Sequence, residues 1–505
     1  MNHDPLVTPA NVVASVPTTN RRRLLQIAGG AGVASLAASR PGRSAGSQDS
    51  ASGWQGTITF YAQAYTPNSK LEGATILQEF QAVADEYQQA HPGIMVQFID
   101  EEFPDYAQTV RVKSAGAEMY DVYWAQWGQL NGTFPKGIAR DLNADFDAPN
   151  PYIEGGGPWR DAMNPTVIGS TGAPTGELYN VNGDFVGTAF FYNPDLFTTA
   201  GITEAPTTWT GLLETCQKLK DAGITPCAGF ADFSWFGRHF LSDFYANDYD
   251  AIVGCDGTPG MSPQDEAAAI NNGLLSTEDP RFLGWLPFFK QLTDFWAQEF
   301  LSQDLATVGD QIERDFASGQ TAMLYTGSWG PNTIKALGGT FTVESFSFPV
   351  LTTDDVEFST GTDTSGAVGG PNAAYQYAMS TPQSNQTMEE EGKEAAVLDF
   401  LQYIGTPAAI ERVVNELGSF APTWPGTTPN PGLETFVEQA NAGLEVVGIG
   451  NSSAKLGPNM QRVFGLYLSG NVDDEGAKQQ TQTELDAAIQ DYTRTNSGIN
   501  LDECQ

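Results

Sequence analysis

The sequence predicts an α/β protein with more than one core. Segments of strand character alternate with segments in which apolar residues recur at helical spacing, a pattern typical of parallel sheets covered by helices on both faces. The chain has 505 residues, which is too long for one ordinary core, so we expect two or three domains or one two-lobed body. Hydrophobic residues make up 40% of it and aromatic residues 11%, which excludes general disorder.

An export signal is predicted at the N-terminus. Three consecutive arginines at 21–23 lead into an apolar stretch over residues 24–38 that ends in small residues. This pattern predicts a signal peptide over residues 1–39; the arginines resemble a twin-arginine signal, and an ordinary secretory signal is the alternative. The Ser- and Gly-rich residues 40–53 predict a flexible linker. No apolar stretch reaches the ~20 residues of a membrane span, so we expect a mature protein without a transmembrane helix in the periplasm or at the cell surface.

The first elements follow in the order strand, helix, strand. The strand is predicted over residues 58–62, and the helix is predicted from an apolar stripe formed by Ile76, Leu77, Phe80, Val83, Ala84 and Tyr87. Residues 91–93, His-Pro-Gly, are expected to stop that helix. Further on we predict a strand over 94–99, a helix over 106–115 and a strand over 121–125.

The later elements continue the alternation. A strand over 188–192 is followed by a helix around 212–219, which Thr208 can cap and Gly223 can close in the left-handed conformation. Apolar spacing predicts two more helices, one over 396–404 and one that includes 485–492.

The cysteines permit disulfides in an exported protein, but their pairing stays open. There are four, which allow three pairings: Cys216, Cys227, Cys255 and Cys504. Cys216 lies on an apolar helical stripe, so a buried free thiol competes with a bridge at that position. Among the pairings we favour Cys227 with Cys255. The spacings match no zinc pattern.

Catalytic signatures are scarce, so we expect no catalytic residue, metal or cofactor. The segment TGSWG at 326–330 approaches a nucleophile elbow, but Thr326 stands where that motif needs Gly, and packing with ligand contact is the simpler interpretation. Only His91 and His239 remain after the signal, and they cannot form a zinc pair. Neither a phosphate-binding loop nor a dinucleotide fingerprint follows a strand.

Four segments carry a resemblance to a known family. They are YNPDLFTTAGITEAPTTWTGLLETCQKLKDAGITPC at 192–227, YQQAHPGIMV at 87–96, FASGQTAMLYTGSWGPNTI at 316–334 and KEAAVLDFLQYIGT at 393–406. Taken in the order in which they occur along the chain, these segments resemble the extracellular solute-binding proteins of ATP-binding-cassette (ABC) importers, in the carbohydrate-binding group that includes maltose-binding protein. The resemblance spans roughly residues 55–495.

The resemblance implies a type II periplasmic-binding-protein-like fold, in which two α/β lobes enclose a ligand cleft. The chain would cross between the lobes, and the ligand would be caught as they close. We therefore expect one lobe from 54–182 plus 352–420 and the other from 183–351 plus 421–505.

Candidate ligand-binding residues combine flat aromatic side chains with hydrogen-bonding groups, as a sugar requires. Several follow predicted strands, where open α/β sheets bind ligands. In the resembling family the loop after the third strand contacts ligand, and Trp329 falls where a sugar-stacking Trp lies. Asp184 lies about two residues from an acidic family contact, and a core position is the alternative for each aromatic. The candidates are Tyr61, Tyr65, Trp124, Gln126, Trp127, Asp184, Trp235 and Trp329.

The expected function is capture of a sugar or oligosaccharide for delivery to ABC permease subunits in the membrane, by a monomer without enzymatic activity. With 61 Asp and Glu against 24 Lys and Arg, the chain repels nucleic acid and anionic lipid, so a neutral or cationic ligand is favoured. The alternatives are another small solute such as a polyamine, and a secreted glycoside hydrolase, which would need two carboxylates across the sugar site.

Overall fold

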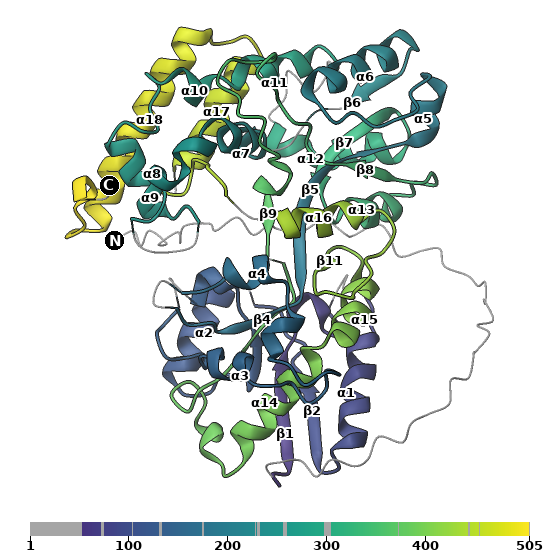
Figure 1. The fold of residues 1–505 in the computed structure, drawn as a ribbon, viewed down its shortest axis with the longest axis vertical. Helices are drawn as coiled ribbons and strands as arrows, with labels where there is room; N and C mark the ends of the chain where they lie inside the picture. Colours follow the sequence, from purple (N-terminus) through teal and green to yellow (C-terminus); the bar gives the residue numbers. More distant parts are fainter. Residues whose placement is uncertain are drawn as a thin grey trace.

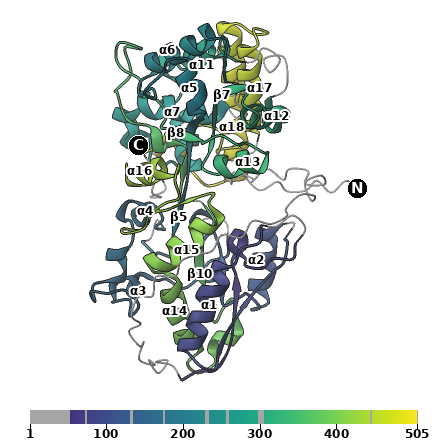
Figure 2. The ribbon, with the colours of Figure 1, turned by 90° about the vertical axis from the view of Figure 1, so that its right-hand side faces the viewer.

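A computed structural model describes most of the chain beyond residue 52. The described residues are 53–71, 75–103, 105–130, 134–173, 176–227, 229, 233–255, 260–296, 305–371, 373–442, 445–453 and 455–503. The predicted signal peptide, and the predicted linker apart from Gly53, lie outside them. The described chain forms two lobes, one above the other in Figure 1 and again separate when the molecule is turned (Figure 2).

The first lobe is built on a five-stranded sheet in the order β2-β1-β3-β10-β4. β1 pairs in parallel with β2 and β3, whereas β10 runs antiparallel to β3 and β4. The strands are β1 (Gly56–Tyr61), β2 (Ile94–Phe98), β3 (Val122–Trp124), β4 (Asn180–Asn182) and β10 (Gln376–Met379). The helices of this lobe are α1 (Glu79–Ala90), α2 (Tyr106–Ala115), α3 (Asn143–Asp147), α4 (Pro165–Gly169), α14 (Lys393–Ile404) and α15 (Pro407–Leu417).

The second lobe is built around the long strand β5 (Asp184–Tyr192), which extends from the waist of the molecule into this lobe (Figure 1). β5 pairs antiparallel with each of its partners, and β6 pairs in parallel with β7. The other strands are β6 (Thr225–Cys227), β7 (Thr321–Gly327), β8 (Glu344–Phe346), β9 (Gly369–Gly370) and β11 (Ala421–Pro422).

Helices cover the second lobe and form most of its upper part. They are α5 (Pro194–Thr199), α6 (Trp209–Asp221), α7 (Phe233–Phe244), α8 (Tyr249–Ile252), α9 (Pro263–Asn271), α10 (Pro280–Leu283), α11 (Leu286–Thr293), α12 (Leu305–Ala317), α13 (Gly330–Ala336), α16 (Glu434–Ala442), α17 (Leu456–Leu468) and α18 (Asp474–Thr495).

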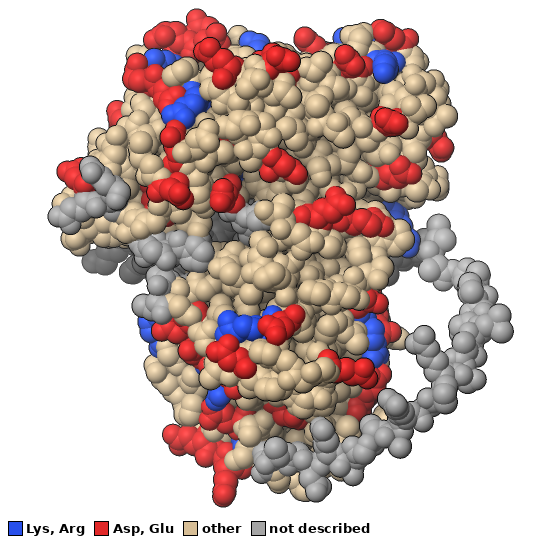
Figure 3. All heavy atoms as spheres, in the orientation of Figure 1, with Lys and Arg blue, Asp and Glu red and all other residues tan. Residues whose placement is uncertain are grey.

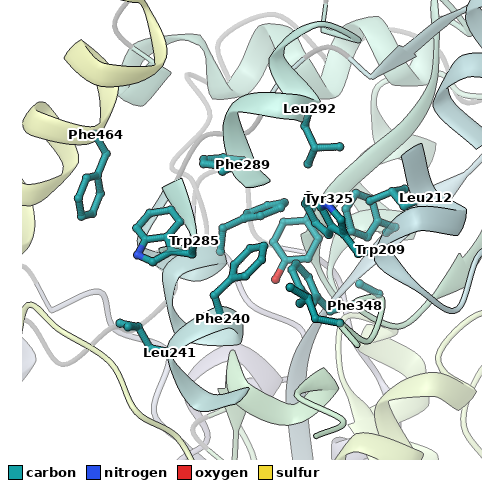
Figure 4. Packing of buried hydrophobic residues seen from close by; sticks show 14 of the residues in the cluster. Trp209, Leu212, Phe240, Leu241, Trp285, Phe289, Leu292, Tyr325, Phe348 and Phe464 are labelled. Carbon is teal, nitrogen blue, oxygen red and sulfur yellow. The ribbon is translucent and has the colours of Figure 1, made fainter. Parts of the chain in front are cut away.

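Each lobe has its own core. In the first lobe Phe60 packs edge-on against Phe80 of α1 and Tyr377 of β10, with ring centroids 5.1 and 4.8 Å apart. In the second lobe Trp209, Phe240 and Trp285 belong to a larger aromatic core, in which side chains from several helices and β7 converge (Figure 4). Two separate cores are what a chain of this length requires.

Most predicted elements are present with small shifts in their ends. The helix at 106–115 is α2, and the helix predicted from Leu212 is α6, whose first turn is capped by Thr208 because its Oγ1 accepts a hydrogen bond from Gly211 N–H at 3.2 Å. Gly223 follows α6 with a φ of 74°, the left-handed conformation expected of it. The apolar stripe predicted the start of α1 too early: the helix begins at Glu79, and Ile76, the first residue of the stripe, is 61% exposed.

The expectation of parallel sheets is confirmed for three of the nine described strand pairings, β1 with β2, β1 with β3 and β6 with β7, and is wrong for the other six, which are antiparallel. β1, β2 and β3 are parallel, as the strand, helix, strand order predicts. β10, β4, β9 and β11 lie far along the chain from their sheet partners and enter antiparallel, since they belong to segments that pass between the lobes. Short-range sequence order cannot reveal such pairings.

The favoured pairing of Cys227 with Cys255 is also wrong. Cys216 and Cys227 are buried free thiols, and burial raises the pKa of each. Cys255 is disulfide-bonded, and Cys504 lies outside the described residues. The helical stripe that indicated a free thiol at Cys216 was the better guide, because Cys216 packs with Trp209 and Leu219 in the second core.

The described part of the chain passes between the lobes three times, and we call these segments the crossings: 182–185, then 368–371 with 373–375, and 420–433. They are joined by hydrogen bonds: Gly183 N–H donates to the Tyr375 carbonyl at 2.9 Å, and the Trp424 indole N–H donates to the Asn182 carbonyl at 2.6 Å. The lobes are therefore connected by one compact joint and not by independent linkers.

The surface reflects the composition. Acidic side chains are spread over both lobes on the face drawn in Figure 3, and basic side chains are fewer. Within the described part of the chain, no helix has the length and apolar character needed to cross a membrane.

Candidate functional site

A cleft of about 690 Å³ lies between the lobes at the crossings. The first lobe contributes residues that follow β1 and β3, and the second contributes β5, α7 and the segment after β7. Side chains at the carboxyl ends of strands in this kind of sheet are well placed to meet a ligand. Five of the eight candidate residues line this cleft: Trp124, Gln126, Trp127, Trp235 and Trp329.

The segment after β3 is held rigidly against β10. Trp127 N–H donates to Gln376 Oε1 at 3.1 Å, and Ala125 N–H donates to the Gln376 carbonyl at 3.0 Å. The Trp124 carbonyl accepts a hydrogen bond from the Tyr106 hydroxyl at 2.5 Å. These bonds fix the backbone that presents Trp124 and Trp127 to the cleft.

Trp235 and Trp329 face each other on the second lobe. Their ring centroids are 6.0 Å apart with an interplanar angle of 72°, an edge-to-face arrangement. Trp329 lies over Gly327, where a Cβ would come within 2.1 Å of its ring. Ser328 between them is fully buried, and its hydroxyl donates a hydrogen bond to the Ser419 carbonyl at 2.7 Å. The TGSWG segment therefore positions an aromatic ring, and its serine has a structural role.

Three tryptophans in the cleft carry an indole N–H that has no hydrogen-bond partner among the described residues: Trp124, Trp127 and Trp235. A buried donor without a partner costs roughly 1–3 kcal/mol. Three such donors around one cleft are suited to a ligand rich in oxygen acceptors.

Tyr61, Tyr65 and Asp184 do not line the cleft. Tyr61 packs against Phe103 and Tyr106, with ring centroids 5.1 Å away in both cases. Tyr65 and Asp184 are fully buried beneath the cleft, where the Tyr65 hydroxyl donates to the Asp184 carboxylate at 2.6 Å. Burial raises the pKa of Asp184 to about 6.

The cleft also contains residues that the sequence did not single out. Gln63 lies two residues after the end of β1 and has a φ of 54°, an uncommon conformation for a residue other than Gly. Its position after a strand was a usable signal. Arg238, Glu445 and Asn451 also line the cleft, and the last two come from residues 445–453, which have no regular structure and therefore no periodic signal.

The loop that carries Asn451 is held by a buried acid on α9. The Glu266 carboxylate accepts hydrogen bonds from Gly450 N–H at 2.9 Å, Asn451 N–H at 2.7 Å and the Ser452 hydroxyl at 2.9 Å. Glu266 is fully buried, and burial raises its pKa while these bonds act in the opposite direction. An irregular segment is thereby fixed at the cleft wall.

A neutral histidine supports the wall behind Trp235. His239 Nδ1 lies 2.7 Å from the Thr364 carbonyl, which can only accept, so Nδ1 carries the proton and Nε2 accepts from the Tyr325 hydroxyl at 2.6 Å. Burial lowers the pKa of His239 to about 3. Tyr325 packs at 6.4 Å from Trp235, which links this network to the cleft.

The charge of the cleft lining is small. Its described residues include one carboxylate, Glu445, and one cation, Arg238. Hydrolysis of a glycosidic bond requires a pair of carboxylates about 5–10 Å apart, and a polyamine site requires several anionic or aromatic partners without a competing cation. The described lining has one carboxylate and not a pair, and Arg238 accompanies its aromatic faces, so aromatic and amide groups dominate the cleft.

The family model of bacterial extracellular solute-binding proteins matches residues 73–411. This match covers more than half of the chain, so the protein belongs to that family. No curated protein matches the sequence.

Solved structures with a similar fold belong to two-lobed type II binding proteins. Apo RafE from Streptococcus pneumoniae is 16% identical, with a TM-score of 0.58 over 86% of this chain and 100% of RafE. The cyclic alpha-maltosyl-1,6-maltose binding protein from Arthrobacter globiformis is 16% identical, with a TM-score of 0.58 over 87% of this chain and 100% of its own. The GacH receptor of Streptomyces glaucescens is 17% identical, with a TM-score of 0.52 over 87% of this chain and 100% of its own. The expected two-lobed α/β fold is thus confirmed.

Proposed function

We propose that this protein is the extracytoplasmic substrate-binding subunit of an ABC importer, and that it captures a sugar or oligosaccharide between its lobes. The observation that carries this proposal is the cleft lining: four tryptophans, three of whose indole N–H groups have no partner among the described residues, beside amide side chains, one carboxylate and one arginine. A sugar offers apolar C–H faces to stack on such rings and hydroxyl oxygens to accept from such donors.

The comparisons support the same ligand class. The similar protein from Arthrobacter globiformis is a binding protein for a cyclic maltose-derived sugar, and the GacH receptor was solved in complex with acarbose. Membership of the extracellular solute-binding family supports the transport role. The permease partner, export through the predicted signal and the monomeric state are inferred from the family and the sequence.

Capture requires that the ligand favour the closed arrangement of the lobes. A ligand can shift this equilibrium only by the difference between its affinities for the two arrangements. The candidate residues come from both lobes, so a ligand that bridges Trp127 and Trp329 gains contacts only when the lobes approach.

Isothermal titration of the mature protein tests the proposal. The panel contains maltotriose, raffinose and acarbose, with spermidine as the cationic comparison. We expect saturable binding of at least one of the three oligosaccharides, with an affinity that changes little between 50 and 500 mM sodium chloride, as for a neutral ligand. Binding of spermidine alone, with a steep loss in salt, would replace the sugar with a polyamine, and release of reducing ends would indicate a hydrolase.

A further inference from the structure

One buried carboxylate lies where the three crossings meet. Asp184 is the first residue of β5 and is paired with Pro422 of β11 in the antiparallel register. Its Oδ2 accepts hydrogen bonds from the Tyr65 hydroxyl at 2.6 Å and from Ala374 N–H at 3.1 Å. Tyr375 N–H donates at 3.0 Å to both carboxylate oxygens. The carboxylate therefore joins the first crossing to the second and to the Tyr65 turn of the first lobe, while the backbone of Asp184 pairs with the third crossing.

These partners connect Asp184 to the floor of the cleft. Tyr65 ends the short 3₁₀ turn η1 (Gln63–Tyr65), whose Gln63 lines the cleft, and Ala374 itself lines the cleft. The crossings also bond to one another at this level, since Thr423 N–H donates to the Gly183 carbonyl at 3.3 Å. A change at Asp184 consequently reaches both the joint between the lobes and the surface that meets the ligand.

The partners suit an ionised carboxylate. The N–H groups of Ala374 and Tyr375 can only donate, so they need an acceptor, and hydrogen bonds to a charged acceptor are roughly twice as strong as neutral ones. A protonated carboxyl group would accept weaker hydrogen bonds, and its own O–H would have to lie near these donors. Only the Tyr65 hydroxyl could reverse and accept it.

We propose that Asp184 is the positioning residue of the interlobe joint: its ionised carboxylate holds the second crossing and the Tyr65 turn against the start of β5, and its protonation frees the lobes to change their angle. This inference concerns the joint itself and needs no bound ligand, so it goes beyond sugar capture. It gives the binding protein a sensitivity to mildly acidic surroundings.

The titration falls in an accessible range. Burial raises the pKa of Asp184 to about 6, while the hydrogen bonds from Tyr65, Tyr375 and Ala374 act in the opposite direction. The titratable groups that face it are the phenols of Tyr65, Tyr375 and Tyr377, and burial raises the pKa of each well above 10. These phenols stay neutral between pH 5 and 7.5, so the proton taken up in this cluster belongs to Asp184.

Amide NMR of the ligand-free mature protein tests the titration. With ¹⁵N-labelled Ala and Tyr, we expect the Ala374 and Tyr375 amide shifts to move with a common midpoint near pH 6. Asp184→Asn should abolish this movement. Tyr65→Phe should raise the midpoint by ~0.5 pH unit or more, because the lost hydrogen bond favoured the ionised form. Shifts that titrate equally in Asp184→Asn would overturn the assignment.

A distance measurement between the lobes tests the positioning role. Spin labels on Met95→Cys in β2 and Leu274→Cys after α9 occupy exposed positions on different lobes, and Cys216 and Cys227 are buried. We expect a narrow distance distribution at pH 7.5, a broader or displaced one at pH 5, and the pH 5 form at both pH values in Asp184→Asn. If the distribution is the same at both pH values while the amides titrate, Asp184 takes up a proton without controlling the joint, and the proposal is wrong. Neither experiment contains sugar, so failure of sugar binding would leave this test intact.

Discussion

At the scale of single residues, the cleft combines two kinds of tryptophan. Trp329 is 9% exposed and lies against Gly327, so it presents a ring that is fixed from behind. Trp124, Trp127 and Trp235 add N–H donors that have no partner in the described part of the chain. Stacking and donation are separable, because one depends on the ring and the other on a single nitrogen. Each gives its own prediction.

Replacing Trp329 removes a stacking surface. Trp329→Ala should weaken binding of the oligosaccharide identified by titration by about 1–3 kcal/mol, since aromatic anchors carry a large share of binding energy. Isothermal titration measures the change, and circular dichroism checks the fold. Trp54→Ala is the control, because Trp54 lies outside the cleft and bonds to Glu390. Unchanged affinity in Trp329→Ala would remove this residue from the site.

Replacing Trp235 by Phe keeps an aromatic face but removes the N–H. We expect Trp235→Phe to weaken the same binding by about 0.5–1.5 kcal/mol, the usual net value of one hydrogen bond. Trp285 provides a matched control, since its indole N–H also has no partner among the described residues but it packs in the second core. Trp285→Phe should leave affinity unchanged. An equal loss in both variants would point to a general effect on the lobe.

The residue types in the cleft were largely predictable from the sequence, but whether a given side chain lines the cleft or is buried beneath it was not. Trp124 ends β3, and Trp127 and Trp329 follow strands, and these positions place them at the cleft. Tyr65 also follows a strand, and Asp184 was predicted from the family resemblance, yet both lie beneath the floor, because a hydrogen bond between them replaces contact with solvent. Local sequence cannot distinguish these outcomes, since the pairing joins residues 119 positions apart.

At the scale of elements, the end of β7 decides where Trp329 lies. β7 pairs with β5 up to Gly327 opposite Thr188, and α13 begins three residues later at Gly330. The short connection returns the Trp329 ring over Gly327, which only a residue without Cβ permits. The strand end and the ligand platform are therefore one structural unit.

Gly327→Ala should displace that platform. The added Cβ would lie 2.1 Å from the Trp329 ring, so the ring must move, and we expect affinity to fall in the same direction as in Trp329→Ala. Overpacking of this kind also destabilises by about 1–3 kcal/mol. Titration and thermal unfolding measure the two effects. Gly116→Ala is the control, since its nearest contact is 3.6 Å away and its φ is −85°. A variant with full affinity would show that Trp329 can move without consequence.

Elements with local determinants were predictable from the sequence. α6 and α14 follow from apolar spacing, and the Thr208 cap and Gly223 closure of α6 are local chemistry. The antiparallel strands β9, β10 and β11 were not predicted, since each is two to four residues long and its partner is distant in the chain. Strands of that length contain too few side chains to show a period.

At the scale of the whole molecule, the three crossings connect two separately folded lobes. Each lobe has a separate core, so each can remain folded while the angle between them changes. The joint contains a buried acid, and the second lobe contains a buried histidine, so proton uptake affects both the joint and the folding equilibrium. The two groups act on folding with opposite sign.

Asp184 favours folding in mild acid. Its pKa is raised from 3.8 to about 6 in the folded protein, so between these values the folded state holds a proton that the unfolded chain has released. The stability that Asp184 contributes is therefore present below about pH 4 and is lost as the pH rises through 6. His239 does the reverse: its pKa is lowered from 6.5 to about 3, so its contribution is present above 6.5 and is lost as the pH falls toward 3.

The pH dependence of the unfolding free energy of the wild type contains both effects, so a variant is needed to separate them. Asp184→Asn removes the acid and keeps His239. We expect the unfolding free energy of the wild type, minus that of Asp184→Asn, to be about 2 kcal/mol larger at pH 4.5 than at pH 7.5. Urea unfolding followed by tryptophan fluorescence measures it at both pH values. A difference that is the same at pH 4.5 and 7.5 would mean that Asp184 has an ordinary pKa, and the acid sensitivity of the joint would then have no physical basis.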